Sequence, residues 1–171
     1  MKYFAYGSNM SLRRLRERVP AVSMLGSCAL SGHQLRFHKS GQDGSAKCDA
    51  FYTGQQEQLL HGALYEIDQG GKSALDRVEG LGMGYQEKLV EVVTAAGVCV
   101  EAVTYYATHI DENLLPFCWY RQHVLVGAQE LGLPQPHVEL IENTEAIRDP
   151  DGERHEQQLA LYAAGSSPLD Q

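Results

Sequence analysis

Alternating and β-rich segments dominate the hydrophobic pattern of this chain. They predict strands over residues 2–6, 28–39, 48–53, 60–67, 85–93 and 98–108. Glycine-rich or polar stretches separate these segments, and a turn at Ala96-Gly97 joins the last two into a hairpin. Because helices are interleaved with the strands, the pattern predicts a mixed α/β (α+β) domain whose strands can curl into a small barrel of about six strands.

Apolar side chains at helical spacing predict four helices in all. The first covers residues 12–19, where Ser11 can cap the helix and the arginines face outward. The longest lies within residues 115–132 and stops at Gly132, and a shorter one follows over roughly residues 136–143.

The remaining helix, "SALDRVEG", lies between two predicted strands over residues 73–80. Ser73 stands three residues before an aspartate, which is the spacing of a capping box. Leu75 and Val78 mark the side that we expect to be buried, and a following glycine can end the helix. Glu79 is therefore expected at its carboxyl end.

The chain divides into a predicted domain over residues 1–143 and a polar arm over residues 144–171 that ends in glycine, serine and proline. The arm is either docked or disordered. It contains "QQLALYAA", whose apolar residues could pack on the barrel or on a second copy of the chain. A homodimer therefore stays open.

Composition limits the classes of function. With 171 residues, 43% hydrophobic and 21% charged, the chain has the size and makeup of one globular domain. A formal net charge of -8 argues against nucleic acid as a partner. The amino-terminal residues do not resemble a signal peptide, and no apolar run is long enough to span a membrane. We therefore expect no membrane partner and a cytoplasmic location.

Cysteine and histidine spacing predicts no metal site. The seven histidines form neither an HExxH motif nor a close ligand pair. The four cysteines form no CxxC pair, which favours buried free thiols. These cysteines are Cys28, Cys48, Cys99 and Cys118. We expect neither a metal ion nor another cofactor.

The loop "YGSNM", residues 6–10, follows the first strand and precedes the first helix. Successive backbone N–H groups at such a junction can form an anion-binding nest, and glycine lets a ligand approach the backbone. The alternative is an ordinary turn in which Asn9 bonds its own backbone. Local sequence favours the turn.

Glu79 is the second candidate for chemistry. Most glutamates at the end of a short helix are solvated and have no function. Here, however, the negative end of the helix dipole and partial burial beside the glycines of "EGLGMG" would both raise its pKa. A carboxyl group with a raised pKa is suited to general acid/base catalysis.

Four segments occur in a suggestive order: "YFAYGSNM", "HGALYEI", "LDRVEGLGMGY" and "PFCWYRQHVLVGAQELGLP". Block by block they resemble the γ-glutamylcyclotransferase (AIG2-like) family, in which a "YGSN" loop opens the chain and an "LD..EG....Y" segment carries one essential glutamate. The resemblance extends over residues 2–142.

This resemblance implies a small β-barrel with flanking helices. It also implies a lyase or transferase reaction that releases 5-oxoproline from small-molecule γ-glutamyl amino acids, peptides or amines, without a cofactor. Glu79 would be the general acid/base. Tyr85 and Tyr120 match substrate-facing tyrosines of the family, although a plain core role suits both equally. Backbone N–H groups of one loop would hold the glutamyl group, in particular its α-carboxylate: Tyr6, Gly7, Ser8, Asn9 and Met10.

The implied reaction needs no enzyme nucleophile, because the α-amine of the substrate can attack its own γ-carbonyl. The carboxylate of Glu79 would take the proton from this amine and return it to the departing amine. For the two parts to act together, Glu79 must face residues 7–9 across one cavity. Which groups stabilise the charge on the γ-oxygen does not follow from the sequence.

Two other functions stay open. A biosynthetic relative with the same site could remove a γ-glutamyl group from an amine or from an acyl-carrier-bound compound. A non-catalytic module could instead bind γ-glutamyl compounds without turnover, although such a module would not need Glu79.

Overall fold

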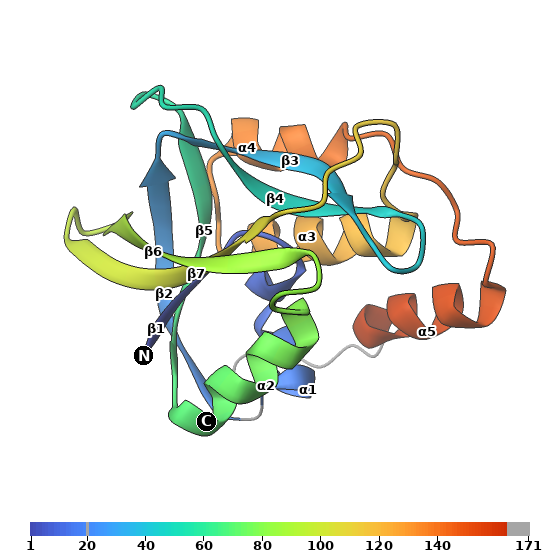
Figure 1. The fold of residues 1–171 in the computed structure, drawn as a ribbon, viewed down its shortest axis with the longest axis horizontal. Coiled ribbons are helices and arrows are strands. Elements are labelled where there is room, and N and C mark those ends of the chain that lie inside the picture. Colours follow the sequence, from blue (N-terminus) through green and yellow to red (C-terminus); the bar gives the residue numbers. More distant parts are fainter. Residues whose placement is uncertain (20, 164–171) are drawn as a thin grey trace.

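The structure, a computed structural model, describes residues 1–19 and 21–163. Within this part of the chain, one sheet closes into a barrel and two further strands form a separate sheet (Figure 1). The order around the barrel is β1 (Lys2–Ala5), β5 (Leu59–Ile67), β2 (Val22–Ser31), β6 (Tyr85–Thr94) and β7 (Cys99–Ala107). These neighbours pair antiparallel, and a parallel pair of Tyr3 with Val103 closes the barrel between β1 and β7. The mixed α/β prediction is confirmed, but the barrel has five strands rather than about six.

The segment predicted as one strand over residues 28–39 is two strands. Gly32 has a φ of 72°, in the left-handed region that favours glycine, and it turns the chain between them. Before this turn β2 pairs with β5 in the barrel. After it, β3 (His33–Ser40) pairs with β4 (Ala46–Tyr52) in the separate sheet. The single-strand prediction was wrong because the flanking residues are β-rich on both sides of the glycine.

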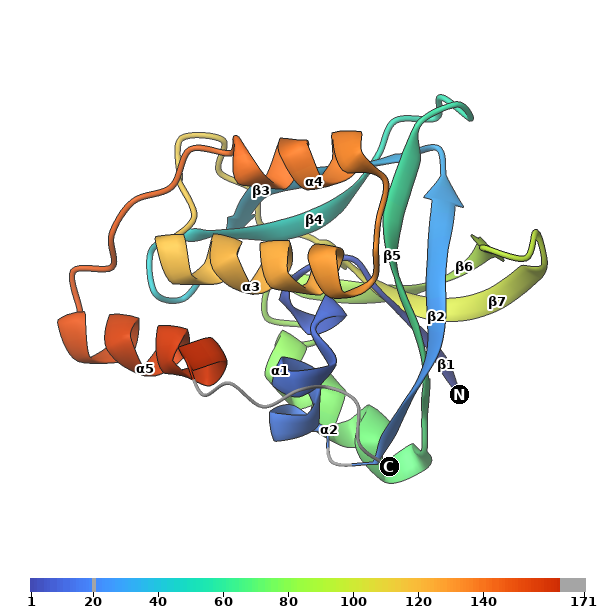
Figure 2. The same cartoon turned by 180° about the vertical axis from the view of Figure 1, so that it is seen from behind.

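The helices lie in two groups around the barrel (Figures 1 and 2). At one end, α1 (Leu12–Arg18) lies beside α2 (Gln69–Glu79). On another side, α3 (Cys118–Glu130) and α4 (Gln135–Glu142) lie beside the β3–β4 sheet. No helix in the described part of the chain is long and apolar enough to cross a membrane.

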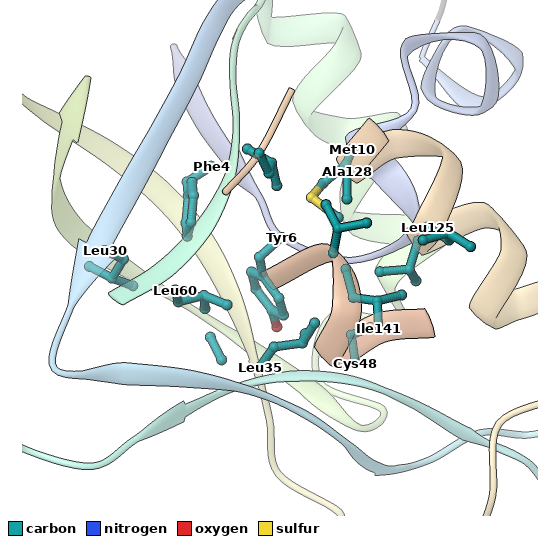
Figure 3. Close-up of a cluster of buried hydrophobic side chains, with 14 of the residues drawn as sticks. Phe4, Tyr6, Met10, Leu30, Leu35, Cys48, Leu60, Leu125, Ala128 and Ile141 are labelled. Atoms are coloured by element: carbon teal, nitrogen blue, oxygen red, sulfur yellow. The ribbon is translucent and has the colours of Figure 1, made fainter. Parts of the chain in front are cut away.

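The main core fills the space between the barrel and helices α3 and α4. Figure 3 shows side chains from opposite walls pointing toward one another. Phe4, Leu60 and Leu30 come from the barrel, and Leu125 and Ile141 come from the two helices. A second cluster lies under α1 and α2, and both clusters are needed to hold the helices on the barrel.

The carboxyl-terminal helix α5 (Gly152–Ala163) docks on α1 and α3. Arg13 donates a hydrogen bond to the carbonyl of Leu161 (3.0 Å), and the ring of His123 contacts the Tyr162 hydroxyl (2.8 Å). The described part of the predicted arm is therefore docked. Its Gly/Ser/Pro-rich end, residues 164–171, lies outside the described residues, and the domain boundary at residue 143 stays a prediction.

Helix α2 carries Glu79 as its last residue, so its placement decides where that carboxylate lies. The helix begins at Gln69 rather than at Ser73, because the side chain of Asp68 accepts a hydrogen bond from the N–H of Gly71 (2.6 Å) and caps it. Gly80, with a φ of 64°, ends it as expected.

The buried side of α2 is narrower than predicted. Leu75 is fully buried in the second cluster, but the Val78 side chain is 41% exposed. The prediction that Val78 is buried was therefore wrong, and Leu75 is the main apolar contact that holds this helix.

We predict that Leu75→Ala lowers the free energy of unfolding by about 2–5 kcal/mol, because it removes a fully buried side chain and leaves a cavity. Val78→Ala is the matched control on the same helix, and it should change this free energy by about 0.5 kcal/mol or less. Urea denaturation of the two variants measures both values. Equal losses would contradict the packing described here.

Candidate active site

The loop after β1 forms a short 3-10 turn, η1 (Ser8–Met10), that packs against helix α3. Gly127 of α3 makes this contact possible. A Cβ atom at Gly127 would lie 2.6 Å from both the Met10 Cβ and the Ser11 nitrogen, too close for any other residue. The fixed contact between turn and helix thus sets where the loop presents its polar groups.

Met10 faces the core rather than a site. Its side chain is fully buried, and Figure 3 shows it beside Ala128 of α3. Its N–H donates to the carbonyl of Gly7 (3.0 Å), and its own carbonyl accepts a hydrogen bond from Tyr65 (2.6 Å). Since both backbone groups are already bonded, the structure contradicts the predicted contact of Met10 with a substrate.

The other seven predicted site residues lie around one small inner cavity of about 30 Å³. They are Tyr6, Gly7, Ser8, Asn9, Glu79, Tyr85 and Tyr120. Tyr3, Cys48 and Tyr105 complete the wall. The loop and the end of α2, which are seventy positions apart, therefore face the same space.

Asn9 joins the loop to Glu79 directly. Its side-chain Nδ2 donates to Glu79 Oε1 (2.6 Å) and to the Tyr3 hydroxyl (3.2 Å), while its Oδ1 accepts from Arg18 Nη1 (3.2 Å). Both ends of the amide are thus bonded to protein groups. Asn9 therefore holds the carboxylate of Glu79 in place. The alternative prediction, a turn in which the Asn9 side chain bonds its own backbone, differs from this arrangement.

Burial raises the pKa of Glu79. The positive charge of Arg18, the hydrogen bond from Asn9 and the more distant charges of Arg14 and Lys39 act in the opposite direction without cancelling this effect. The position of Glu79 at the end of α2, where the helix dipole is negative, further disfavours its charged form.

Two of the predicted site residues, Tyr85 and Tyr120, hold strand β4 beside the loop of residues 6–10. Tyr85 donates its hydroxyl proton to the carbonyl of Cys48 (2.6 Å), and the Tyr120 hydroxyl accepts the N–H of Cys48 (3.0 Å). A Cβ atom at Gly7 would lie 3.1 Å from the Cys48 Cβ, so glycine allows this close approach. Tyr85 and Tyr120 therefore combine a core role with a place on the cavity wall.

Cys48 places its thiol on the cavity wall. Burial raises its pKa to about 12, so it is protonated at neutral pH. Cys28 is also buried and free, but Cys99 is exposed and Cys118 is half-buried, so the prediction of buried thiols was wrong for these two. Among the described residues, no three His, Cys, Asp or Glu side chains lie close enough together to hold a metal ion.

A larger vestibule of about 370 Å³ adjoins the inner cavity and shares Ser8, Glu79, Tyr85 and Tyr120 with it. Its wall carries basic side chains that the sequence did not single out: Arg14, Arg18, Lys39, Lys47 and Arg77. The prediction that the arginines of the first helix face outward was wrong for Arg14, which is 5% exposed. Helical spacing could not reveal that Arg14 is buried, because it locates only apolar faces. The side chains that cover Arg14 come from other helices, including His123 of α3 and Gln158 of α5.

Comparisons with known proteins agree with this architecture. The model of the AIG2-like family matches residues 59–141. Gamma-glutamylcyclotransferase from Homo sapiens is 26% identical over 148 residues, which cover 84% of this chain and 78% of that protein. A solved structure of a gamma-glutamyl cyclotransferase has a TM-score of 0.84 at 24% identity and covers 96% of this chain and 99% of that one. An uncharacterized protein from Homo sapiens has a TM-score of 0.81 at 25% identity, with coverages of 94% and 96%.

The fold and the cavity define this chain as a small barrel protein in which a glycine-containing loop and a helix-end carboxylate line one polar space. Residues 59–141 match the AIG2-like family, and the chain is similar to γ-glutamylcyclotransferases over most of its length.

We predict that Asn9→Ala raises the pKa of Glu79 further, because the substitution removes a hydrogen bond to the charged carboxylate. An NMR titration of the side-chain carboxyl carbons measures this pKa directly, without any substrate. The exposed Asn143 provides a control, and Asn143→Ala should leave the Glu79 titration unchanged. A lower pKa in Asn9→Ala would contradict the proposed contact.

Proposed function

We propose that this protein is a cyclotransferase that acts on a small γ-glutamyl compound and releases 5-oxoproline and the free amine. The observation that carries the proposal is the 2.6 Å hydrogen bond from Asn9 to Glu79 across the wall of the inner cavity. It brings the loop that would bind the glutamyl group within reach of the carboxylate that would move the proton.

The polar lining of the inner cavity offers the groups that would bind the glutamyl end of a substrate, although the cavity of about 30 Å³ would have to widen to admit it. Gly7, Ser8 and Asn9 line it, and the first N–H groups of a helical turn have no acceptor within that turn. These N–H groups would bind the α-carboxylate. The cavity is small, so the amine half of the substrate would extend past Glu79 into the vestibule.

Glu79 would transfer one proton twice. Its carboxylate accepts a proton from the substrate's ammonium group, and the free α-amine then attacks the γ-carbonyl carbon. The new C–N bond closes the five-membered ring. As the bond to the departing amine breaks, Glu79 returns the proton to that nitrogen, and the ring nitrogen releases its second proton to water, so that the lactam keeps one N–H and Glu79 is again a carboxylate. A raised pKa makes the carboxylate a stronger base for the first transfer and brings the group closer to neutral pH, where a single group serves best as both base and acid.

The tyrosines around the cavity would act as neutral donors. Burial raises the pKa of the Tyr120 phenol well above its usual range, so the proton remains on its oxygen. The hydroxyl accepts the N–H of Cys48 and also interacts with the Cys48 thiol, and its proton would turn from this sulfur to an oxygen of the substrate. We propose that this proton stabilises the charge that develops on the γ-oxygen.

Cys48 would take no covalent part. The thiolate is the reactive form of cysteine, and a pKa of about 12 keeps this thiol protonated. The internal amine of the substrate makes an enzyme nucleophile unnecessary.

We predict that Glu79→Gln lowers kcat/KM for 5-oxoproline release by about 10²–10⁴-fold, the loss expected for a positioned acid/base. The assay follows 5-oxoproline formed from a panel of γ-glutamyl amino acids, peptides and amines. The exposed Glu139→Gln is the matched control and should retain activity. Full activity of Glu79→Gln would overturn the role of Glu79, and wild-type protein that binds the panel without turnover would be a binding module instead.

We also predict a defined pH dependence. The free enzyme needs ionised Glu79, so kcat/KM falls as the pH falls through the pKa of this group. Arg18 lowers that pKa, and Arg18→Gln should therefore shift the acid limb of the pH profile to higher pH. Arg16→Gln removes the same charge from the exposed side of α1 and should leave the limb in place. A shift to lower pH in Arg18→Gln would argue against Glu79 as the titrating group.

A further inference from the structure

The vestibule beside Glu79 is positively charged in a chain whose formal net charge is -8. Five basic side chains line it, against only Asp43 and Glu79 among the acidic ones. Lys47 pairs with Asp43 (2.8 Å), which neutralises one charge of each sign. The remaining basic side chains therefore outnumber Glu79 by three on the wall that would surround the amine half of a substrate.

Lys39 is the most unusual of these groups. It is 7% exposed, and among the described residues its ammonium group makes neither an ion pair nor a hydrogen bond. Its Nζ lies 4.7 Å from the centre of the Tyr85 ring. Burial lowers the pKa of Lys39, and the negative charges of Glu79 and Asp43 act in the opposite direction. A largely buried ammonium group without an ion pair is stabilised further when an anion binds beside it.

The local backbone is built around this lysine. Strand β3 carries a bulge between Phe37 and Lys39, and bulges commonly redirect a side chain beside a site. On the opposite side, Gly84 leaves the space that the lysine fills, because a Cβ atom there would lie 3.0 Å from both Cε and Nζ. Two departures from regular structure thus place one unpaired cation at the vestibule.

Arg14 adds a second buried cation whose partners are neutral. Its Nη1 contacts His123 (2.8 Å) and Gln158 (2.9 Å), and the buried Nε makes no hydrogen bond within the described residues. Burial and the charge of Arg14 lower the pKa of His123 to about 3, so the imidazole carries no charge at neutral pH. No carboxylate of the described residues pairs with Arg14, and its charge is available to a bound anion.

We propose that the vestibule selects γ-glutamyl compounds whose amine half carries anionic groups, and that it prefers two such charges to one. This inference rests on the proposed function. The basic excess can accommodate more than a single carboxylate, and Lys39 and Arg14 would supply the charge-assisted hydrogen bonds. The group recognised is a carboxylate or a phosphate, which share this chemistry. Neutral γ-glutamyl amines would be poor substrates.

A panel of four compounds tests the charge preference. γ-Glutamyl-aspartate and γ-glutamyl-asparagine have nearly the same size and differ by one charge, γ-glutamyl-ethylamine has no charge on the amine half, and γ-glutamyl-phosphoserine replaces a carboxylate by a phosphate. The measured quantity is kcat/KM for 5-oxoproline release. We expect kcat/KM for γ-glutamyl-aspartate to exceed that for γ-glutamyl-asparagine by about tenfold, because one charged hydrogen bond contributes about that much. γ-Glutamyl-ethylamine should have the lowest kcat/KM. The faster of aspartate and phosphoserine identifies the preferred anion.

Lys39→Met tests whether the preference comes from the vestibule. It should reduce the aspartate-to-asparagine ratio of kcat/KM to about one-tenth of its wild-type value. Lys2→Met, on the exposed start of β1, is the matched control and should leave the ratio unchanged. If Lys39→Met fails to fold, the exposed Arg77→Gln replaces it, with Arg16→Gln as its control, and a smaller reduction of the same ratio is expected.

The outcomes separate this inference from the proposed function. Turnover of all four compounds with an aspartate-to-asparagine ratio of one or less would overturn the charge preference and leave the cyclotransferase function intact. An unchanged ratio in the folded Lys39→Met and Arg77→Gln variants would also overturn it. Turnover of none of the four, nor of any compound in the wider panel, would overturn the proposed function and this inference together.

Discussion

The site depends on how far helix α2 runs back along the barrel. Because β1 and β5 are antiparallel, β5 ends at Ile67 beside the start of β1, at the end of the strand pair away from the loop. Helix α2 then extends for eleven residues, about 16 Å, which is comparable with the length of β1. Glu79 thereby returns to the level of Asn9, and one hydrogen bond joins two distant parts of the chain.

Opposing electrostatic effects meet at that hydrogen bond. Burial and the helix terminus favour the neutral carboxyl group of Glu79, whereas Arg18, Asn9 and the basic vestibule favour the carboxylate. The balance leaves a group that can both accept and donate a proton. The same cations that limit the pKa of Glu79 also line the space beyond it, so in the proposed function one set of charges would act on both proton transfer and substrate choice.

Local patterns predicted most of the elements, and the errors have identifiable causes. Gly80 and Gly132 end their helices as expected, because a left-handed residue is a strong stop signal. Gly32 was missed as a turn since both flanking segments are β-rich. Ser73 and Asp68 are both good capping residues, and the choice between them is made by where β5 ends. Val78 has apolar character and suitable spacing, but the second cluster reaches only as far as Leu75.

The sequence by itself determined most of the strands and the first four α-helices, the loop at residues 6–10 and the place of Glu79 at a helix end. Only the tertiary structure decided that Met10 points into the core, that Asn9 holds Glu79 and that Arg14 and Lys39 reach one vestibule. The physical reason is that periodicity reports which side of an element is apolar, whereas a site is formed by polar side chains from several elements. Their meeting depends on barrel closure and helix length, which no single segment encodes.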